Sequence, residues 1–591
     1  MSNRVTYILA GILLATLFFM AVFSMKDDSL TMDEVAHLPA GYSYLTQKDM
    51  RLNPEHPPLL KDLAAIPLLF IKGINFPQDI KAWKEDINSQ WDFGFNFLYN
   101  SGNPADKMIF WGRLPMILIL ILLGFYIFKW AKELFGSKVA LLSLFLFSFS
   151  PTFISHGRLV TTDVGAAAGV FIATYYFIKA LKFSTKRNII LAGISFGLAE
   201  LCKFSVILLI PFFAILALIW GAMRTPSSSS PSLPSEARWQ KALKILILVF
   251  IIGYLLIWPV YQYHVWNYPP ERQARDTEFL LGSTPFPKVR EILVWASTKP
   301  ILRAYAQYGL GLALVLQRAT GGNTTYFLGE VSAAGWKNYF PIVYLLKEPL
   351  TFHILTLIAL LYAAFSIKKP FWQDTKRRIS NWLKNHFTEF TMLVFIGIYW
   401  AFSLYSNLNI GVRHLLPVFP FTFVLVSIMT VNLLKEPFLK LKYFVLALLI
   451  LWQVISVVSI YPHFLAYFNE IVGGPNKGYI YTVDSNLDWG QDLERLKKWV
   501  EENKIDKIYV DYFGGGDAKY YLKTKYAPWW GTRDKKELPK GSYLAVSATF
   551  LQGGRGEPVP GFNQPYGYYR WLDQYQPIAK IGYSIFIYYV D

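Results

Sequence analysis

The stretch that decides the fold is MIFWGRLPMILILILLGFYIFK, residues 108–129. About twenty apolar residues in a row match the length that an α-helix needs to cross the hydrocarbon core of a bilayer. The chain as a whole is 53% hydrophobic, above the usual range of globular proteins. Similar apolar stretches recur between polar loops. With the quoted one, they are 6–25, 108–129, 139–157, 160–179, 188–203, 204–222, 244–263, 341–366, 390–407, 413–434 and 443–463. The sequence therefore predicts an α-helical polytopic membrane protein with about eleven transmembrane helices.

The first stretch is too long for a signal peptide and has no small-residue cleavage site before Lys26, so we expect it to remain as an anchor.

The distribution of Lys and Arg predicts the orientation in the membrane. One set of connecting segments is rich in these residues and poor in acids: 129–138, 179–187, 224–244, 368–384 and 435–442. The positive-inside rule makes this set cytoplasmic, together with the N-terminus. An odd number of spans then places residues 464–591 outside the cytoplasm. The formal charge of +18 is explained by this topology, so no nucleic-acid partner is expected.

Two regions are predicted, a membrane region of residues 1–463 and a smaller outer domain of residues 464–591. The membrane region carries two long outer loops, 26–107 and 264–340. The run Ser227 to Ser230 reads as a flexible linker in a cytoplasmic loop. The outer domain combines a polar helix near 490–503 with β-like runs at 507–512, 543–548 and 583–589, which indicates an α/β fold.

Gly514 to Gly516 reads as a turn, with a phosphate-binding loop as the less favoured alternative. The single cysteine, Cys202, excludes a disulfide framework within the chain.

The first outer loop carries the clearest chemical pattern. Thr31-Met32-Asp33-Glu34-Val35-Ala36-His37 follows the first apolar stretch, and Asn53-Pro54-Glu55-His56-Pro57-Pro58-Leu59 comes about twenty residues later. Acids just outside a spanning helix lie where a lipid phosphate meets water, and glycosyl transfer needs a carboxylate to accept the proton of the attacking hydroxyl. Alternatively, Asp33 and Glu34 only cap a helix at the interface, since acids favour helix N-termini. This segment alone leaves both interpretations open.

The same motifs resemble a known family. Asp33-Glu34-Val35, His37, His56-Pro57-Pro58-Leu59 and Lys61 look like the first outer loop of the protein O-mannosyltransferases (glycosyltransferase family 39). These belong to the GT-C membrane glycosyltransferases, which also include the aminoarabinose transferases. In the eukaryotic enzymes the histidine follows the Asp-Glu-Val run directly, whereas here Ala36 intervenes, which puts only the role of His37 in question. The resemblance implies a GT-C fold, a polyprenyl-phosphate sugar donor and a catalytic role for the Asp-Glu pair.

Further motifs extend the resemblance over most of the membrane region. Gly157-Arg158 with Thr162-Asp163, Lys203, and the stretches 409–417 and 484–492 are similar to features of this superfamily or of its bacterial members. Yeast-type enzymes carry a β-trefoil outer domain, and nothing in 464–591 suggests one. Asp484, Asp488 and Asp492 recur every four residues, which fits either a cation site or, as we prefer, an acidic helix start.

Four ionisable residues lie near the outer ends of predicted spans, namely Asp163, Lys203, Arg413 and His414. Charges at such depth are costly and usually face a cavity, although a single cation can also snorkel to lipid headgroups. Because Asp33 and Glu34 lie at the same face, we expect one shared site. Lys203 and Arg413 are predicted to flank one outer cavity, with Asp33 on the opposite wall.

These observations predict an enzyme that transfers a sugar from a polyprenyl-phosphate donor to an acceptor, preferably a protein hydroxyl, on the outer face of the membrane. The predicted catalytic residues are Asp33 as general base with Glu34, His37, His56 and Asp163. The predicted phosphate-binding residues are Lys203, Arg413, His414 and Arg158. Glu34 and Asp163 are candidate ligands for a divalent cation, and no nucleotide cofactor is expected. Two alternatives remain: the same chemistry with a lipid or polysaccharide acceptor, and a non-enzymatic lipid or solute transporter, which is disfavoured because the sequence has no internal repeat.

Overall fold

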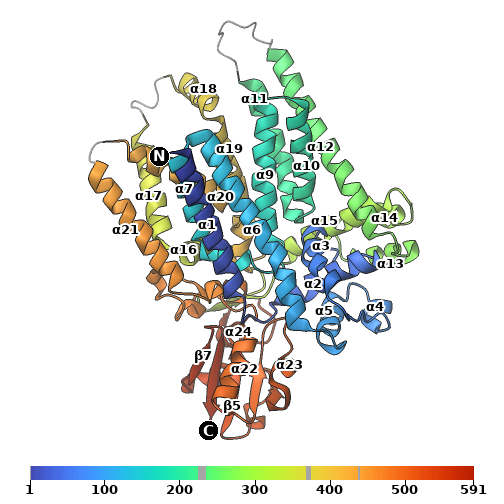
Figure 1. Cartoon of the computed structure of the whole chain (residues 1–591). Coiled ribbons are helices and arrows are strands. Elements are labelled where there is room, and N and C mark those ends of the chain that lie inside the picture. Colours follow the sequence, from blue (N-terminus) through green and yellow to red (C-terminus); the bar gives the residue numbers. More distant parts are fainter. Residues whose placement is uncertain (1, 224–234, 368–373, 437–438) are drawn as a thin grey trace.

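The computed structural model describes residues 2–223, 235–367, 374–436 and 439–591. The predicted linker Ser227 to Ser230 lies outside these described residues. A bundle of long helices forms one end of the molecule, and a small domain with a sheet forms the other (Figure 1). The N-terminal helix starts near the end of the bundle that is far from this domain, in which the C-terminus lies (Figure 1).

Seven helices in the described part of the chain are long and apolar enough to cross a membrane. They are α1 (Asn3–Ser24), α6 (Ala105–Phe135), α9 (Asp163–Lys182), the continuous pair η3 (Phe204–Leu208) and α11 (Leu209–Ala222), α12 (Ser235–His264), α19 (Phe387–Tyr405) and α21 (Leu439–Val458). Their apolar side chains form one large core, which α9 enters most deeply because small residues such as Ala166, Ala167 and Ala173 let neighbouring helices approach. The membrane-protein prediction is thereby confirmed.

The remaining predicted spans are shorter or broken, so the count of eleven is not confirmed. They correspond to α7 (Ser137–Ser148) with α8 (Pro151–His156), α10 (Lys186–Glu200), α16 (Tyr339–Lys347) with α17 (Leu350–Phe365), and α20 (Phe419–Leu433). The axes of α16 and α17 differ by 113°, so this pair is one broken span or a re-entrant loop. Pro151 and Pro349 stand at two of the breaks, where proline cannot donate the hydrogen bond that would continue a helix.

The two long outer loops fold into short helices on the same side of the bundle (Figure 1). Loop 26–107 contains α2 (Met32–Gln47), α3 (Leu59–Ala65), the 3₁₀ turn η1 (Ile66–Phe70), α4 (Lys81–Lys84), α5 (Gln90–Phe95) and the π turn η2 (Asn96–Asn100). Loop 264–340 contains α13 (Pro270–Leu280), α14 (Pro287–Ser297), α15 (Arg303–Gly321) and the hairpin β1 (Thr325–Phe327) and β2 (Glu330–Ser332). Phe70 at the end of η1 is 80% exposed, as expected of an apolar side chain in a short helix that lies at a membrane interface.

Residues 464–591 form a mixed α/β unit with a five-stranded sheet of order β4-β3-β5-β8-β7. Its strands are β3 (Ile508–Asp511), β4 (Tyr526–Pro528), β5 (Ser542–Ser547), β7 (Ala579–Ile581) and β8 (Ile585–Val590), and its helices are α22 (Leu493–Glu502), α23 (Ala518–Leu522) and α24 (Ala548–Arg555). Strands β3, β4 and β5 are parallel, whereas β8 is antiparallel to both its neighbours. The predicted β-like runs are confirmed as β3, β5 and β8. Strand β6 (Glu557–Pro558) pairs with β2, so the outer loop 264–340 is joined to the tail.

Candidate active site

Helix α2 begins where the first spanning helix has ended, and its first turn carries the acidic pair. The Glu34 carboxylate accepts hydrogen bonds from the Thr31 backbone N–H at 2.9 Å and from its hydroxyl at 3.0 Å. This capping box fixes the start of the helix. Adjacent residues of a helix are about 100° apart around its axis, so Asp33 and Glu34 point in different directions.

Four charged side chains form a continuous chain of ion pairs. Lys203 donates to Asp163 at 2.5 Å, Arg413 Nη1 contacts Asp163 at 3.4 Å, and the same nitrogen donates to Asp33 at 2.6 Å. Lys203 lies at the start of η3 and Asp163 at the N-terminus of α9. Arg413 lies in the 3₁₀ turn η4 (Val412–Leu415) and Asp33 in α2. The predicted meeting of Lys203 and Arg413 is therefore confirmed. Asp33, however, lies directly on Arg413 rather than on an opposite wall, because the two opposite charges pair.

Asp33, Lys203 and Arg413 border a cavity of about 440 Å³ between the bundle and the two outer loops. Its polar lining includes Asp33, His37, Glu55, His56, Lys203, Arg318, Arg413 and His414. Its apolar lining includes Leu312, Val315 and Leu316 of α15 and Phe402 of α19. Asp163 itself stands behind the two cations and does not line the cavity. A cavity with both charged and apolar walls suits an amphipathic ligand with an anionic group.

The charge state of Asp33 follows from its neighbours. Burial alone would raise the pKa of Asp33, but the positive charge of Arg413 outweighs burial and leaves that pKa below its usual value. The carboxylate is therefore ionised at neutral pH and able to accept a proton. Its side chain is 23% exposed, so a ligand in the cavity can reach it.

His37 and His56 lie beside Asp33 with their rings nearly perpendicular and the ring centroids 5.0 Å apart. His37 Nδ1 donates to the carbonyl oxygen of Val160 at 2.9 Å. Burial lowers the pKa of both imidazoles, and that of His56 falls well below its usual value. Both rings are therefore neutral. The ammonium of Lys61 donates to the carbonyl oxygens of Asn53 and His56 and so holds the loop that carries His56.

The structure places two predicted site residues, Glu34 and Arg158, outside the cavity. Glu34 is fully buried in a bidentate pair with Arg113, at 2.9 and 2.6 Å, and also accepts from the backbone N–H of Val160. Arg158 forms a buried ion pair with Asp28 at 2.7 Å and donates a hydrogen bond to Ser24 Oγ at 2.9 Å. Neither residue lines the cavity. Each is bound by a buried partner that the sequence did not reveal, and their predicted roles with the base or acceptor and with the donor phosphate stay predictions.

The predicted cation ligands are also paired with cationic side chains. Glu34 binds Arg113, and Asp163 binds Lys203 and Arg413. Across the described ranges, no group of three or more His, Cys, Asp or Glu side chains is arranged to hold a metal ion. Asp488 and Asp492 are fully buried, and Thr549 N–H and Ser584 Oγ donate to them respectively. Helix α22 begins directly after Asp492, as expected of an acidic helix start, and the cation site stays the untested alternative.

Sequence reasoning missed several residues of the site. Arg318 lines the cavity from α15 with an exposed side chain, and no motif marks it. Glu55 lies inside the quoted loop motif but was given no role, and Gln90 and Asn88 donate to it. Arg113 stands within the deciding apolar stretch, where an isolated cation is itself a signal for a buried partner.

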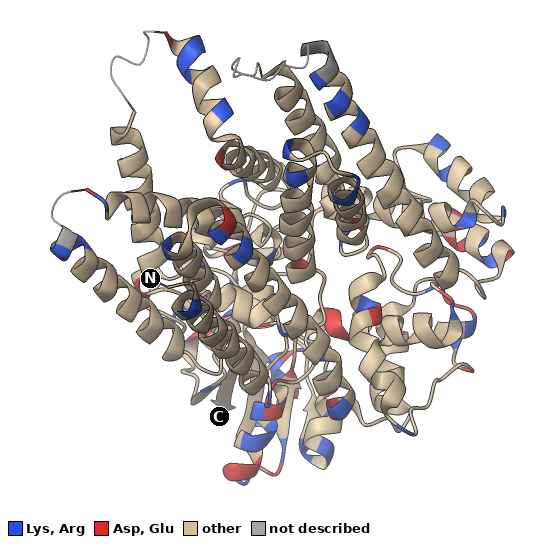
Figure 2. Cartoon of the chain, turned by 45° about the horizontal axis from the view of Figure 1, so that its top comes forward, with Lys and Arg blue, Asp and Glu red and all other residues tan. Residues whose placement is uncertain are grey.

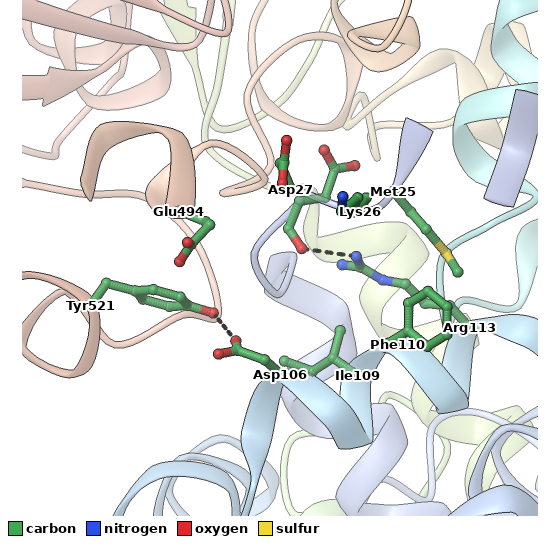
Figure 3. Close-up of a pocket in the computed structure, with 10 residues that line it drawn as sticks. Met25, Lys26, Asp27, Asp106, Ile109, Phe110, Arg113, Glu494 and Tyr521 are labelled. Atoms are coloured by element: carbon green, nitrogen blue, oxygen red, sulfur yellow. Dashed lines mark hydrogen bonds between the residues drawn. The ribbon is translucent and has the colours of Figure 1, made fainter. Parts of the chain in front are cut away.

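A second, smaller hollow of about 160 Å³ lies where α1, α6 and the outer domain meet (Figure 3). Tyr521 donates to Asp106 across it at 2.7 Å, and Arg113 donates to the Asp28 carbonyl at 3.0 Å (Figure 3). It shares no lining residue with the larger cavity. Its contacts join the outer domain to the bundle, and we assign it no chemistry.

One protein family matches the chain. The sequence model of the dolichyl-phosphate-mannose-protein mannosyltransferases matches residues 105–258, the segment that carries Asp163 and Lys203. The match covers less than half of the chain. It confirms the resemblance to the mannosyltransferases and, with it, the glycosyltransferase class. A comparison with curated protein sequences gave no match.

Solved structures show distant likeness. The archaeal oligosaccharyltransferase AglB from Archaeoglobus fulgidus, solved with an inhibitory peptide and a dolichol-phosphate, has a TM-score of 0.45 and 13% identity over 90% of this chain and 69% of its own. ArnT from Cupriavidus metallidurans, bound to undecaprenyl phosphate, has a TM-score of 0.33 and 11% identity. The match covers 100% of this chain and 98% of the ArnT chain. The S. cerevisiae protein O-mannosyltransferase Pmt1–Pmt2 complex, bound to the sugar donor, has a TM-score of 0.36 and 18% identity. The match covers 45% of this chain and 34% of the matched chain. All three TM-scores lie below 0.5, so the functional argument rests on the geometry and the family match.

Proposed function

We propose that the chain transfers a sugar from a polyprenyl-phosphate-linked donor to a protein hydroxyl on the outer face of the membrane. The observation that carries the proposal is the convergence of Asp33, Lys203 and Arg413 on one cavity. The match to a family described as protein mannosyltransferases supports both the lipid-linked donor and the protein acceptor.

The chemistry is a displacement at the anomeric carbon. The acceptor oxygen attacks that carbon, and the bond to the phosphate oxygen breaks with its electron pair on the phosphate. Asp33 takes the hydroxyl proton, for which its ionised state is suited. The donor phosphate carries one negative charge as a diester and gains a second as the lipid phosphate departs. Lys203 and Arg413 are the groups that stabilise this growing charge.

The lining of the cavity matches the two parts of such a donor. The phosphate is an anion suited to Lys203 and Arg413, while Leu312, Val315 and Leu316 on α15 offer an apolar surface for the first isoprene units. Arg318 on the same helix adds a positive charge beside this surface. His414 and the neutral imidazoles of His37 and His56 supply hydrogen-bonding groups around the sugar.

The test is a transfer assay with purified protein, polyprenyl-phosphate hexoses as donors and Ser/Thr peptides as acceptors. We expect release of polyprenyl phosphate together with a hexose mass increment on the peptide. Mass analysis of outer-surface proteins and of glycolipids from cells with and without the protein identifies the acceptor class. If the sugar is found only on glycolipids or polysaccharide, the acceptor is a lipid or polysaccharide rather than a protein, and the proposed transfer reaction stands. No release of polyprenyl phosphate from any donor would contradict the enzymatic proposal and favour a transporter.

A further inference from the structure

The conspicuous motif 484–492 of the outer domain has no role in the chemistry above, yet it contacts the site from two sides. On one side it binds the residues that precede Asp33. Ser29 N–H donates to the Gln491 carbonyl at 2.9 Å, Ser29 Oγ to the Gly490 carbonyl at 2.7 Å, and Met32 N–H to the Trp489 carbonyl at 3.0 Å. The start of helix α2 is thus bonded to a segment more than four hundred residues away in sequence.

On the other side the motif binds the loop that carries Arg413. Val412 N–H donates to Asn486 Oδ1 at 2.9 Å, and Ser485 Oγ donates to the Ile410 carbonyl at 2.5 Å. Gly411 between them has φ 150°, and a Cβ there would lie 2.2 Å from Ser485 Oγ. Only glycine allows this close approach. The motif therefore fixes the positions of both loops that supply the Asp33–Arg413 pair.

Trp489 lies at the centre of this arrangement. Its side chain is 1% exposed, and the Arg413 guanidinium carbon lies 4.2 Å from the centroid of its ring. Arg413 Nη1 donates to Asp33 and Asp163, while its Nε has no hydrogen-bond partner in the described part of the chain. The direction of the guanidinium plane is therefore set by one nitrogen and by the face of the indole, which attracts a cation.

We propose that Trp489 is a positioning residue for sugar transfer, which orients Arg413 so that one guanidinium serves both the Asp33 carboxylate and the phosphate of the lipid donor. This inference rests on the function proposed above. Trp489 does not touch the reacting atoms itself. Without its ring, Arg413 can rotate away from Asp33, and both the base and the phosphate site lose their alignment.

The alternative is that Trp489 only fills the junction between the outer domain and the bundle. It packs on Leu159 and Leu465, which would also make it buried. The pH dependence of transfer separates the two roles. Asp33 faces Arg413 of η4, Asp163 of α9, Asp484 of the tail and His37 of its own helix. Of these, only Arg413 lies on the Trp489 ring and holds the pKa of Asp33 down by direct contact.

The experiment compares Trp489→Leu and Trp489→Phe with Trp529→Leu in the purified full-length protein. Trp529 is a matched control, because it is 4% exposed, lies in the same outer domain and carries its own cation, Arg533, at 5.1 Å. For Trp489→Leu we expect kcat to fall about 10-fold per folded molecule, as loss of a desolvated cation–π contact implies. We also expect the acidic limb of the rate profile to move to higher pH, since a free Asp33 binds its proton more tightly. Trp489→Phe should recover most of the rate.

Two results overturn the inference while the transfer activity stands. One is a Trp489→Leu profile with the wild-type shape, reduced only in the amount of folded protein, as expected of Trp529→Leu. The other is a Trp489→Phe variant as impaired as Trp489→Leu although folded. Absence of transfer by the wild-type protein overturns the proposed function and this inference together.

Discussion

Asp33 and Glu34 are consecutive acids with opposite environments. Asp33 projects into the cavity beside Arg413, whereas Glu34 projects into the protein and is saturated by Arg113 and two backbone N–H groups. A carboxylate with every acceptor position occupied cannot take part in proton transfer without losing its ion pair. This difference supports Asp33 rather than Glu34 as the base of the proposed transfer.

Replacement of Asp33 by Asn should abolish transfer in a folded protein. The carboxamide keeps the shape but cannot accept the proton, so we expect a loss of at least ~100-fold in kcat. The control is Asp27→Asn in the same loop, because Asp27 pairs with Lys498 at the surface. Near-normal turnover of Asp33→Asn would reassign the base.

Arg413 should tolerate Lys only in part. Lysine keeps the positive charge but loses the planar fork that serves two partners and lies on an aromatic ring. We expect kcat to fall ~10-fold for Arg413→Lys and ~100-fold or more for Arg413→Ala in the same transfer assay. Wild-type activity of Arg413→Lys would mean that the fork has no role, and a lysine variant no better than Arg413→Ala would mean that the charge alone contributes nothing.

The sequence could indicate these residues but not their directions. Asp33, Lys203 and Arg413 were predictable because ionisable groups at the outer ends of apolar stretches are rarely accidental. Glu34 and Arg158 satisfy the same criterion, but the directions of their side chains toward Arg113 and Asp28 depend on tertiary packing. Trp489 could not be linked to Arg413, because no local rule connects residues so far apart in sequence.

At the scale of elements, the buried pair between α2 and α6 should matter for stability rather than for catalysis. Arg113→Met leaves the Glu34 carboxylate buried without its partner, which typically costs about 3–5 kcal/mol. Denaturant unfolding in detergent measures the change. Combining it with Glu34→Leu should recover part of the loss, since no charge then remains unpaired.

The control for this prediction is Lys498→Met, which removes a pair whose side chains are 45% and 42% exposed. Such surface pairs contribute about 0–1 kcal/mol. If Arg113→Met unfolds no more readily than this control, the pair is not a structural brace.

Element boundaries could be predicted only where the chain obeys one simple rule. Long apolar stretches became helices, and the alternating runs of the tail became β3, β5 and β8. The predicted number of spans is not confirmed. At α7–α8 and α16–α17, prolines divide an apolar stretch that hydropathy alone counts as one helix.

At the scale of the whole molecule, the orientation in the membrane remains a prediction. Lys and Arg gather toward the ends of the bundle helices far from the outer domain, including those of α12 and α18 (Thr375–Asn385) (Figure 2). We expect that end to be cytoplasmic. Reporter fusions after residue 235 and after residue 591 should report opposite compartments, and the same compartment for both would contradict the scheme.

The contacts of the motif 484–492 with both loops of the site have a consequence for the order in which the protein is synthesised and assembled. The ribosome makes the Asp33 loop first, the Arg413 loop much later and the motif 484–492 later still, so the nascent chain holds all the charges of the site before it holds the part that aligns them. Most of the membrane region can thus be inserted while the centre is still unassembled. We therefore expect the site to become aligned only after residues 484–492 have emerged and docked.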